Sequence, residues 1–313
     1  MKVPFQPNNA TGFIGVLETV KPVLPFPGLV LVCFALYFFF KKTWRELDEE
    51  SYQLRTEARE RGELWDPRPL VALVTVAAVL MAQEYYGTRS FYEFSIKPWL
   101  KEIAAARVSL ERPDPFGLSR YEDLYGHGFW VITRCGGYLL PLVVWKIAFR
   151  KDSILDMGLR TAGFFKHAKL YGLFLVVVAG AMVLVSRSPD FGTYYPFYKL
   201  SSRSYWDLLL WELMYFAQFF SLEMFFRGWM LAALRRSMGS AAIFVMAVPY
   251  CMIHFGKPYL EVGGAIVAGI ALGSLSMKTK SIYQGFLLHI SIALSMDLLA
   301  LSHRNALPTQ MWP

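Results

Sequence analysis

The sequence contains few cysteines, and their placement excludes a disulfide framework. Cys33, Cys135 and Cys251 are scattered among apolar runs, and none of them is part of a CxxC motif. Isolated thiols in such runs are explained more simply as small packing residues than as redox or metal-binding groups. We therefore expect no redox role for this chain.

Several other features are missing from the sequence. It has no HExxH zinc-protease motif, no internal repeat, no low-complexity tract and no separable soluble domain. At the N-terminus, Lys2 is followed by a polar stretch before any long apolar run begins, which is not the order found in a cleavable signal peptide. We expect a single membrane domain whose first span is retained.

Charged residues are sparse beside apolar ones. The 313 residues are 55% hydrophobic, 16% aromatic and 18% charged, with a mean hydropathy of +0.35. These values exclude a soluble domain and a disordered chain. The net charge of +8 comes from bases between apolar runs, where they anchor spans to lipid head groups. The expected partner is the lipid bilayer, and we expect no binding of nucleic acid.

The apolar runs have the length of membrane spans. A bilayer core of about 30 Å requires about 20 mostly apolar helical residues. Eight segments approach this requirement, namely 22–40, 69–87, 128–148, 170–187, 205–235, 239–254, 262–277 and 281–301. The sixth and seventh are short, so we expect them to be inner helices. The sequence predicts an all-α, polytopic membrane helix bundle of about eight transmembrane helices.

The basic residues between these spans predict the orientation. They concentrate in 41–68, in 149–169, at Arg235–Arg236 and at Lys278 and Lys280. All four places fall on one side of an eight-span path, which is cytoplasmic by the positive-inside rule. Residues 41–68 are also mostly good helix formers, and we expect them to extend the first span. We predict a multi-pass protein of the cell inner or plasma membrane.

Two opposite charges stand inside the apolar run 219–232. Glu223 and Arg227 are four residues apart, so on a helix they project from one face and can neutralise each other. Ionisable residues within a membrane span are costly and are a functional hypothesis by default. The alternative is a structural ion pair that joins helices, and the sequence leaves both interpretations open.

Three more ionisable residues lie at membrane depth near the C-terminus. His254 ends the short sixth span, which Pro249 can bend. His289 lies in the middle of the last span, and Asp297 follows it by eight residues on the same face. Each has a structural alternative: a helix cap for His254, a hydrogen bond to a neighbouring helix for His289, and a solvated position for Asp297.

Together these groups suit hydrolysis of a peptide bond in or near the membrane. A desolvated carboxylate is a good general base, so Glu223 and His254 would activate a water. His289 would stabilise the oxyanion that forms when this water attacks an amide carbonyl. Two histidines and a glutamate also suit zinc, but Arg227 would repel a cation. We expect no metal and no cofactor.

The motifs resemble a known family. EMFFRG at 223–228, YCMIHFG at 250–256 and a histidine in the last span are similar to the CAAX protease and bacteriocin-processing family of intramembrane glutamic endopeptidases. Its members show EExxxR, FxxxH and HxxxN or HxxxD on an all-helical membrane core of about eight spans. The resemblance implies three parts of the chain. Residues 1–159 form N-terminal spans with charged loops, 160–301 form a catalytic core, and 302–313 form a short tail.

The resemblance also implies roles for individual residues. Glu223 matches the second Glu of EExxxR, and Arg227 matches its Arg. His254 matches the histidine of the second motif, and His289 matches that of the third. Tyr250 stands for the Phe of FxxxH, which keeps a ring to support substrate or oxyanion. The first Glu of EExxxR, the water-activating residue in the family, is Leu222 here. The polar residue expected four after His289 is Ala293, and Asp297, one turn further along, is its candidate substitute.

The departure at Leu222 leaves two functions open. Either Glu223 alone acts as the base of an endopeptidase that cleaves a membrane-anchored or hydrophobic peptide, or the chain keeps the scaffold as a non-catalytic binding or chaperone-like protein. We favour hydrolysis, because a pure scaffold has little physical reason to hold four polar groups in lipid. A proton-coupled transporter ranks third, since no inverted repeat supports it.

Overall fold

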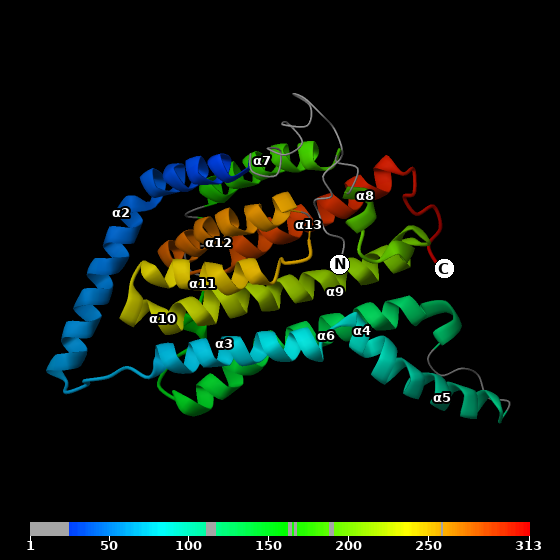
Figure 1. The fold of residues 1–313 in the computed structure, drawn as a ribbon, viewed down its shortest axis with the longest axis horizontal. Coiled ribbons are helices and arrows are strands. Elements are labelled where there is room, and N and C mark those ends of the chain that lie inside the picture. The colour runs from blue at the N-terminus through cyan, green and yellow to red at the C-terminus, as the bar shows by residue number, and fades with distance from the viewer. Residues whose placement is uncertain (1–24, 111–116, 162–164, 166–167, 188–190, 258) are drawn as a thin grey trace, which may run out of the picture. The chain divides into compact units, whose positions relative to one another are not determined.

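The computed structural model describes residues 25–110, 117–161, 165, 168–187, 191–257 and 259–313. The expectation about a signal peptide and the predicted start of the first span at residue 22 lie outside these residues. The described part is built from helices and contains no strand (Figure 1). This confirms the all-α prediction.

The helices follow the predicted spans closely. In the first half they are α2 (Pro25–Glu60), α3 (Arg68–Tyr85), α4 (Arg89–Phe91), π-helix η1 (Tyr92–Ile96), α5 (Lys97–Val108), α6 (Leu118–Ala148) and 3-10 helix η2 (Ile154–Asp156). In the second half they are α7 (Ala168–Val185), α8 (Phe191–Tyr194), 3-10 helix η4 (Lys199–Ser202), α9 (Tyr205–Glu223), π-helix η5 (Met224–Met230), α10 (Leu231–Met238), α11 (Ala241–Met252), α12 (Tyr259–Thr279) and α13 (Tyr283–His303).

The lengths of these helices define a multi-pass integral membrane protein. Among the described residues, six helical stretches are long and apolar enough to cross a membrane. The fourth and sixth predicted spans are represented by shorter apolar stretches, Tyr171–Gly180 within α7 and the whole of α11. The polytopic bundle is therefore confirmed, and the seventh predicted span, expected to be short, is the 21-residue helix α12.

The chain divides into two compact units. One combines the chain up to Glu63 with Arg235–Leu275, and the other combines Leu64–Leu234 with Ser276–Pro313. The first unit therefore holds α2, α11 and most of α12, and the second holds α3 to α9, η5 and α13. The predicted functional boundary between residues 159 and 160 falls inside the second unit and stays a prediction.

In the first unit, the long helix α2 continues from its apolar half into the charged segment, as predicted for residues 41–68. Several contacts join it to the C-terminal helices. Trp44 Nε1 donates a hydrogen bond to Ser274 Oγ of α12 at 2.9 Å, and Ser240 N, before α11, donates to Asp48 Oδ1 at 2.7 Å. The charged half of α2 thus has a structural role within this unit.

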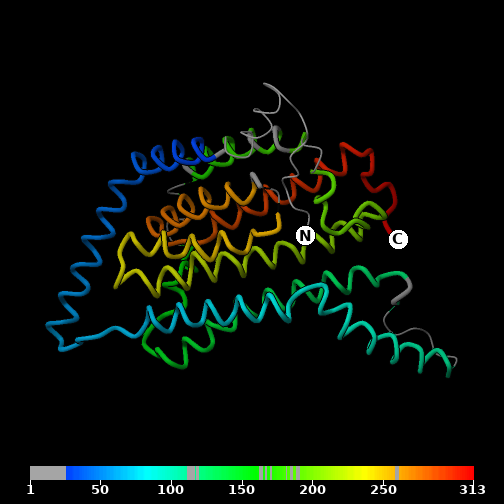
Figure 2. Tube along the Cα trace, in the orientation of Figure 1, coloured from blue at the N-terminus to red at the C-terminus, as the bar shows by residue number. Residues whose placement is uncertain are grey.

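In the second unit, α9 packs against α6 and α13, and α13 packs against α7. The Cα trace in Figure 2 follows α9 without a break through η5 into α10. A buried aromatic cluster of Tyr198, Trp211 and Tyr215 lies beside Ala293 of α13. Apolar burial of this kind joins helices that are distant in sequence, and it sets which face of α9 meets α13.

An ion pair joins the start of α3 to the loop after α6. Arg68 Nε and Nη2 donate to Asp152 Oδ2 and Oδ1 at 3.0 and 2.8 Å, and Trp145 Nε1 donates to Oδ2 at 3.1 Å. The hydrogen bonds from Arg68 hold the pKa of the Asp152 carboxyl below its usual value. The carboxylate is therefore ionised at neutral pH, and the pair is maintained there.

Candidate functional site

The predicted charge pair of α9 forms in the structure. Glu223 is the last residue of α9, and Arg227 lies in η5, which follows directly. Arg227 Nη1 is 3.1 Å from Glu223 Oε1, and both side chains are fully buried, at 0% exposure. The two charges therefore neutralise each other inside the unit, as four-residue spacing on a helix predicts.

The helix that carries the pair is not a regular α-helix. Residues Met224–Met230 form a π-helix, whose hydrogen bonds to the fifth residue widen the turn. Gly228 lies in this turn, and a Cβ added to it would be 2.5 Å from the carbonyl oxygen of Met157. Only glycine allows this close approach of two backbones. The apolar run 219–232 is compatible with an ordinary α-helix, so the widened turn was not predicted.

His289 of α13 contacts the same carboxylate. Its Nδ1 is 2.8 Å from Glu223 Oε1, and its ring stacks on Phe219 with the centroids 5.1 Å apart. The His289 side chain is 14% exposed, whereas Glu223 and Arg227 are at 0%. The structure therefore brings three of the predicted site residues together, and His289 is the least buried of them.

Gly285 provides the space for the Glu223 carboxylate. It precedes His289 by one turn on α13, and a Cβ at this position would be 2.8 Å from Glu223 Oε2. Among the described residues, Oε2 has no hydrogen-bond partner. A buried carboxylate oxygen with unused lone pairs is costly unless another group donates to it. Oε2 is therefore suited to accept a hydrogen bond from a water or a substrate.

Asp297 lies outside this group. It is fully buried, so the solvated position considered from the sequence is wrong. Trp211 Nε1 of α9 donates to Asp297 Oδ2 at 2.8 Å, and the buried carboxyl of Glu212 interacts electrostatically with Asp297. The role of Asp297 in supporting an oxyanion stays a prediction.

Sequence reasoning missed two polar contacts at membrane depth. The first is Glu212, which is 4% exposed and interacts with Asp297. The second is Arg134 in the middle of α6, whose Nη1 donates to Gln83 Oε1 of α3 at 2.7 Å. Both ionisable residues stand in predicted apolar spans, and the rule that singled out Glu223 would have identified them.

Tyr250 and His254 belong to the first unit. Tyr250 is 1% exposed in α11, which contains Pro249 as predicted. His254 follows the end of this helix, with its Nδ1 2.9 Å from the Tyr250 carbonyl oxygen. If Nδ1 donates this hydrogen bond, Nε2 is the basic nitrogen. The expected approach of His254 to Glu223 stays a prediction.

A protein-family model matches part of the chain, from just before α9 to within α13. Residues 204–295 match the family model for type II CAAX prenyl endopeptidase Rce1-like proteins. The matched segment includes the Glu223, Arg227 and His289 contacts and also contains Tyr250 and His254. No curated protein and no solved structure matches the chain. The family match confirms the resemblance that the motifs indicated.

Proposed function

We propose that this chain, with a core similar to that of CAAX-type prenyl endopeptidases, hydrolyses a peptide bond in a membrane-anchored or hydrophobic peptide. The observation that carries the proposal is the buried contact of Glu223 with Arg227 and His289, together with the unpartnered oxygen Oε2. The family match supports an intramembrane protease in general. Its partners are then the lipid bilayer and a peptide substrate.

In the proposed mechanism, Glu223 is the general base. A water donates to Oε2, and Glu223 takes its proton as the water oxygen bonds to the scissile carbonyl carbon. Arg227 contacts the other oxygen, Oε1, which keeps the carboxylate ionised and oriented. Leu222 occupies the position of the first family Glu and is 4% exposed. The single carboxylate of Glu223 therefore performs the water activation.

The proposed role of His289 follows from its contact and its exposure. Its Nδ1–H donates to Glu223 Oε1, so the proposed role uses the imidazolium form of the ring, in which Nε2–H donates to the carbonyl oxygen as negative charge develops there. The proton held by Glu223 then passes to the amide nitrogen, and the C–N bond breaks. That His254 also binds this water stays an expectation from the sequence.

The substitution at Leu222 favours a second candidate, a non-catalytic protein that binds membrane peptides on the same scaffold. One experiment separates the two functions. The full chain is reconstituted in vesicles with a panel of membrane-anchored apolar tail peptides in water enriched in ¹⁸O. Hydrolysis predicts one ¹⁸O atom in the new terminal carboxylate, measured by mass spectrometry. Binding of the peptides without any cleaved product would contradict the proposal.

Treatment with a chelator tests whether a zinc ion takes part in the reaction. Within the described residues, no group of three His, Cys, Asp or Glu side chains is placed to hold a metal ion. The proposed mechanism predicts that cleavage persists at an undiminished rate after dialysis against a strong chelator. Loss of cleavage that added Zn²⁺ restores would instead assign the reaction to a metal-bound water.

Gly285→Ala is expected to slow cleavage by about 10- to 100-fold, because a Cβ displaces the Glu223 carboxylate and misplaces the base. The matched control is Gly172→Ala, since a Cβ on Gly172 of α7 meets nothing within 4 Å. Cleavage rates are compared after both variants are shown to melt cooperatively in detergent. Equal rates in the two variants would show that the position of Oε2 does not matter.

A further inference from the structure

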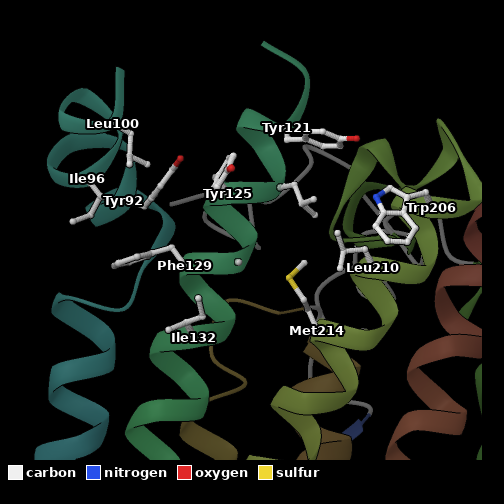
Figure 3. A pocket seen from close by; sticks show the side chains of 12 residues that line it. Tyr92, Ile96, Leu100, Tyr121, Tyr125, Phe129, Ile132, Trp206, Leu210 and Met214 are labelled. Carbon is white, nitrogen blue, oxygen red and sulfur yellow. The ribbon is translucent and has the colours of Figure 1, made fainter. Parts of the chain in front are cut away.

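The second unit contains an apolar groove between η1, α5, α6 and α9, with a volume of about 570 Å³. We call it the aromatic groove. Figure 3 shows Tyr92, Ile96 and Leu100 on one side and Trp206 and Met214 on the other, with α6 between them. Its size and its mainly apolar and aromatic lining are typical of a ligand-binding pocket.

The groove follows the membrane span α6. Its lining on this helix extends from Tyr121 to Ile132, which corresponds to about 17 Å at 1.5 Å per residue. This is about one half of a hydrocarbon core of about 30 Å. The groove therefore runs from near the start of helix α6 to near its middle. An extended alkyl chain from one leaflet has the corresponding length and shape.

The hydroxyl of Tyr92 is a buried polar group of the groove that needs an acceptor. Tyr92 is 1% exposed, and its hydroxyl has no hydrogen-bond partner among the described residues. Its ring packs on Phe129 with the centroids 5.7 Å apart. Burial raises the pKa of Tyr92, so the hydroxyl stays protonated and acts as a donor. A ligand with a carbonyl oxygen at this depth would satisfy it.

The helix beside the groove suits the membrane interface. On α5, Leu100 lines the groove, and Lys101, the next residue, has a half-exposed side chain, at 53%. Trp99 and Phe94 are exposed at 59% and 83%. Exposed aromatic residues interleaved with bases are typical of a segment at the level of lipid head groups. Lys101 Nζ is 3.3 Å from Glu122 Oε2, so its charge is paired within the protein.

We propose that the aromatic groove binds one acyl chain of a glycerophospholipid, with the Tyr92 hydroxyl donating to the ester carbonyl. A peptide segment fits the lining less well. An extended peptide brings a donor and an acceptor at each residue, and these have few partners in an apolar groove. This lipid site is separate from the Glu223 group and does not depend on the proposed peptidase function.

Filling the groove tests the site. A Cβ on Gly128, which lines the groove, meets only Met214 Sδ at 3.9 Å, so Gly128→Leu fits the backbone while its side chain occupies the cavity. The matched control is Gly136→Leu on the same helix, where a Cβ meets nothing within 4 Å. The full chain is delipidated in detergent, titrated with dioleoyl phosphatidylglycerol and analysed by native mass spectrometry. We expect at least tenfold weaker lipid retention for Gly128→Leu alone; equal retention would overturn the proposal.

The contact between the Tyr92 hydroxyl and the ester carbonyl is tested by removing the oxygen atom from either partner. Dioleoyl phosphatidylglycerol is compared with its dialkyl ether analogue, which lacks the carbonyl oxygen. The wild type is expected to prefer the diester by about fivefold, the worth of one hydrogen bond, and Tyr92→Phe to bind both lipids equally. Equal binding of both lipids by the wild type would overturn the contact. Displacement of bound lipid by an apolar peptide at equal concentration would assign the groove to peptide instead.

Discussion

Glu223→Gln is expected to slow peptide cleavage by about 10²- to 10⁴-fold, the usual contribution of a general base. The amide is nearly isosteric with the carboxylate, but it cannot take a proton from the water bound at Oε2. Cleavage is measured with the reconstituted full chain at saturating peptide, so that a change in binding does not hide the chemical step. The loss is expected in kcat, because the amide still accepts hydrogen bonds and peptide binding is preserved.

The matched control for this substitution is Glu212→Gln. Glu212 is a buried glutamate of the same helix, and it interacts electrostatically with Asp297. The change leaves the contacts of Glu223 with Arg227 and His289 in place, so wild-type cleavage is expected. If both variants cleave like the wild type, Glu223 is not the base. If neither the variants nor the wild type cleave, the non-catalytic interpretation gains support.

Arg227→Met is expected to lower the free energy of unfolding by about 3–5 kcal/mol, the usual result of removing one partner of a buried ion pair. Methionine fills similar space but leaves the Glu223 charge at 0% exposure with only His289 beside it. Unfolding is measured in detergent by denaturant titration followed by tryptophan fluorescence. Cleavage is also expected to fall, since the carboxylate loses the group that orients it.

Two comparisons separate this effect from a general loss of charge. Arg160→Met breaks an ion pair with Asp156 in which both side chains are more than half exposed, and such pairs contribute little to stability because water screens them. The double variant Glu223→Gln, Arg227→Met removes both buried charges and should recover part of the lost stability. If Arg227→Met is as stable as Arg160→Met, the buried pair does not stabilise the fold.

Much of the fold follows from hydropathy and helical periodicity alone. An apolar run of span length must satisfy its backbone groups internally, so it forms a helix in lipid, and each of the eight predicted runs overlaps a helix. The contact of Glu223 with Arg227 also follows from local geometry, because four residues make about one helical turn. Both inferences involve residues that are close in sequence.

The rest of the candidate site depends on how α9 and α13 pack. Periodicity shows that His289 and Asp297 share a face of α13, but not which part of α9 that face meets. In the structure the same face contacts Glu223 through His289 and Trp211 through Asp297, so the two polar residues serve different groups. The side chains whose volumes decide this alignment are distant in sequence, so helical periodicity does not reveal how they pack.

The sequence by itself determined the membrane class, the order of the spans and the neutralised pair of Glu223 and Arg227, because these depend on local apolar length and helical spacing. Only the tertiary structure decided that His289 meets Oε1, that Gly285 leaves room for Oε2, and that η5 widens the helix at Arg227. Each of these features is a close contact between segments far apart in the chain. Such contacts are set by packing against other helices and loops, which no local pattern contains.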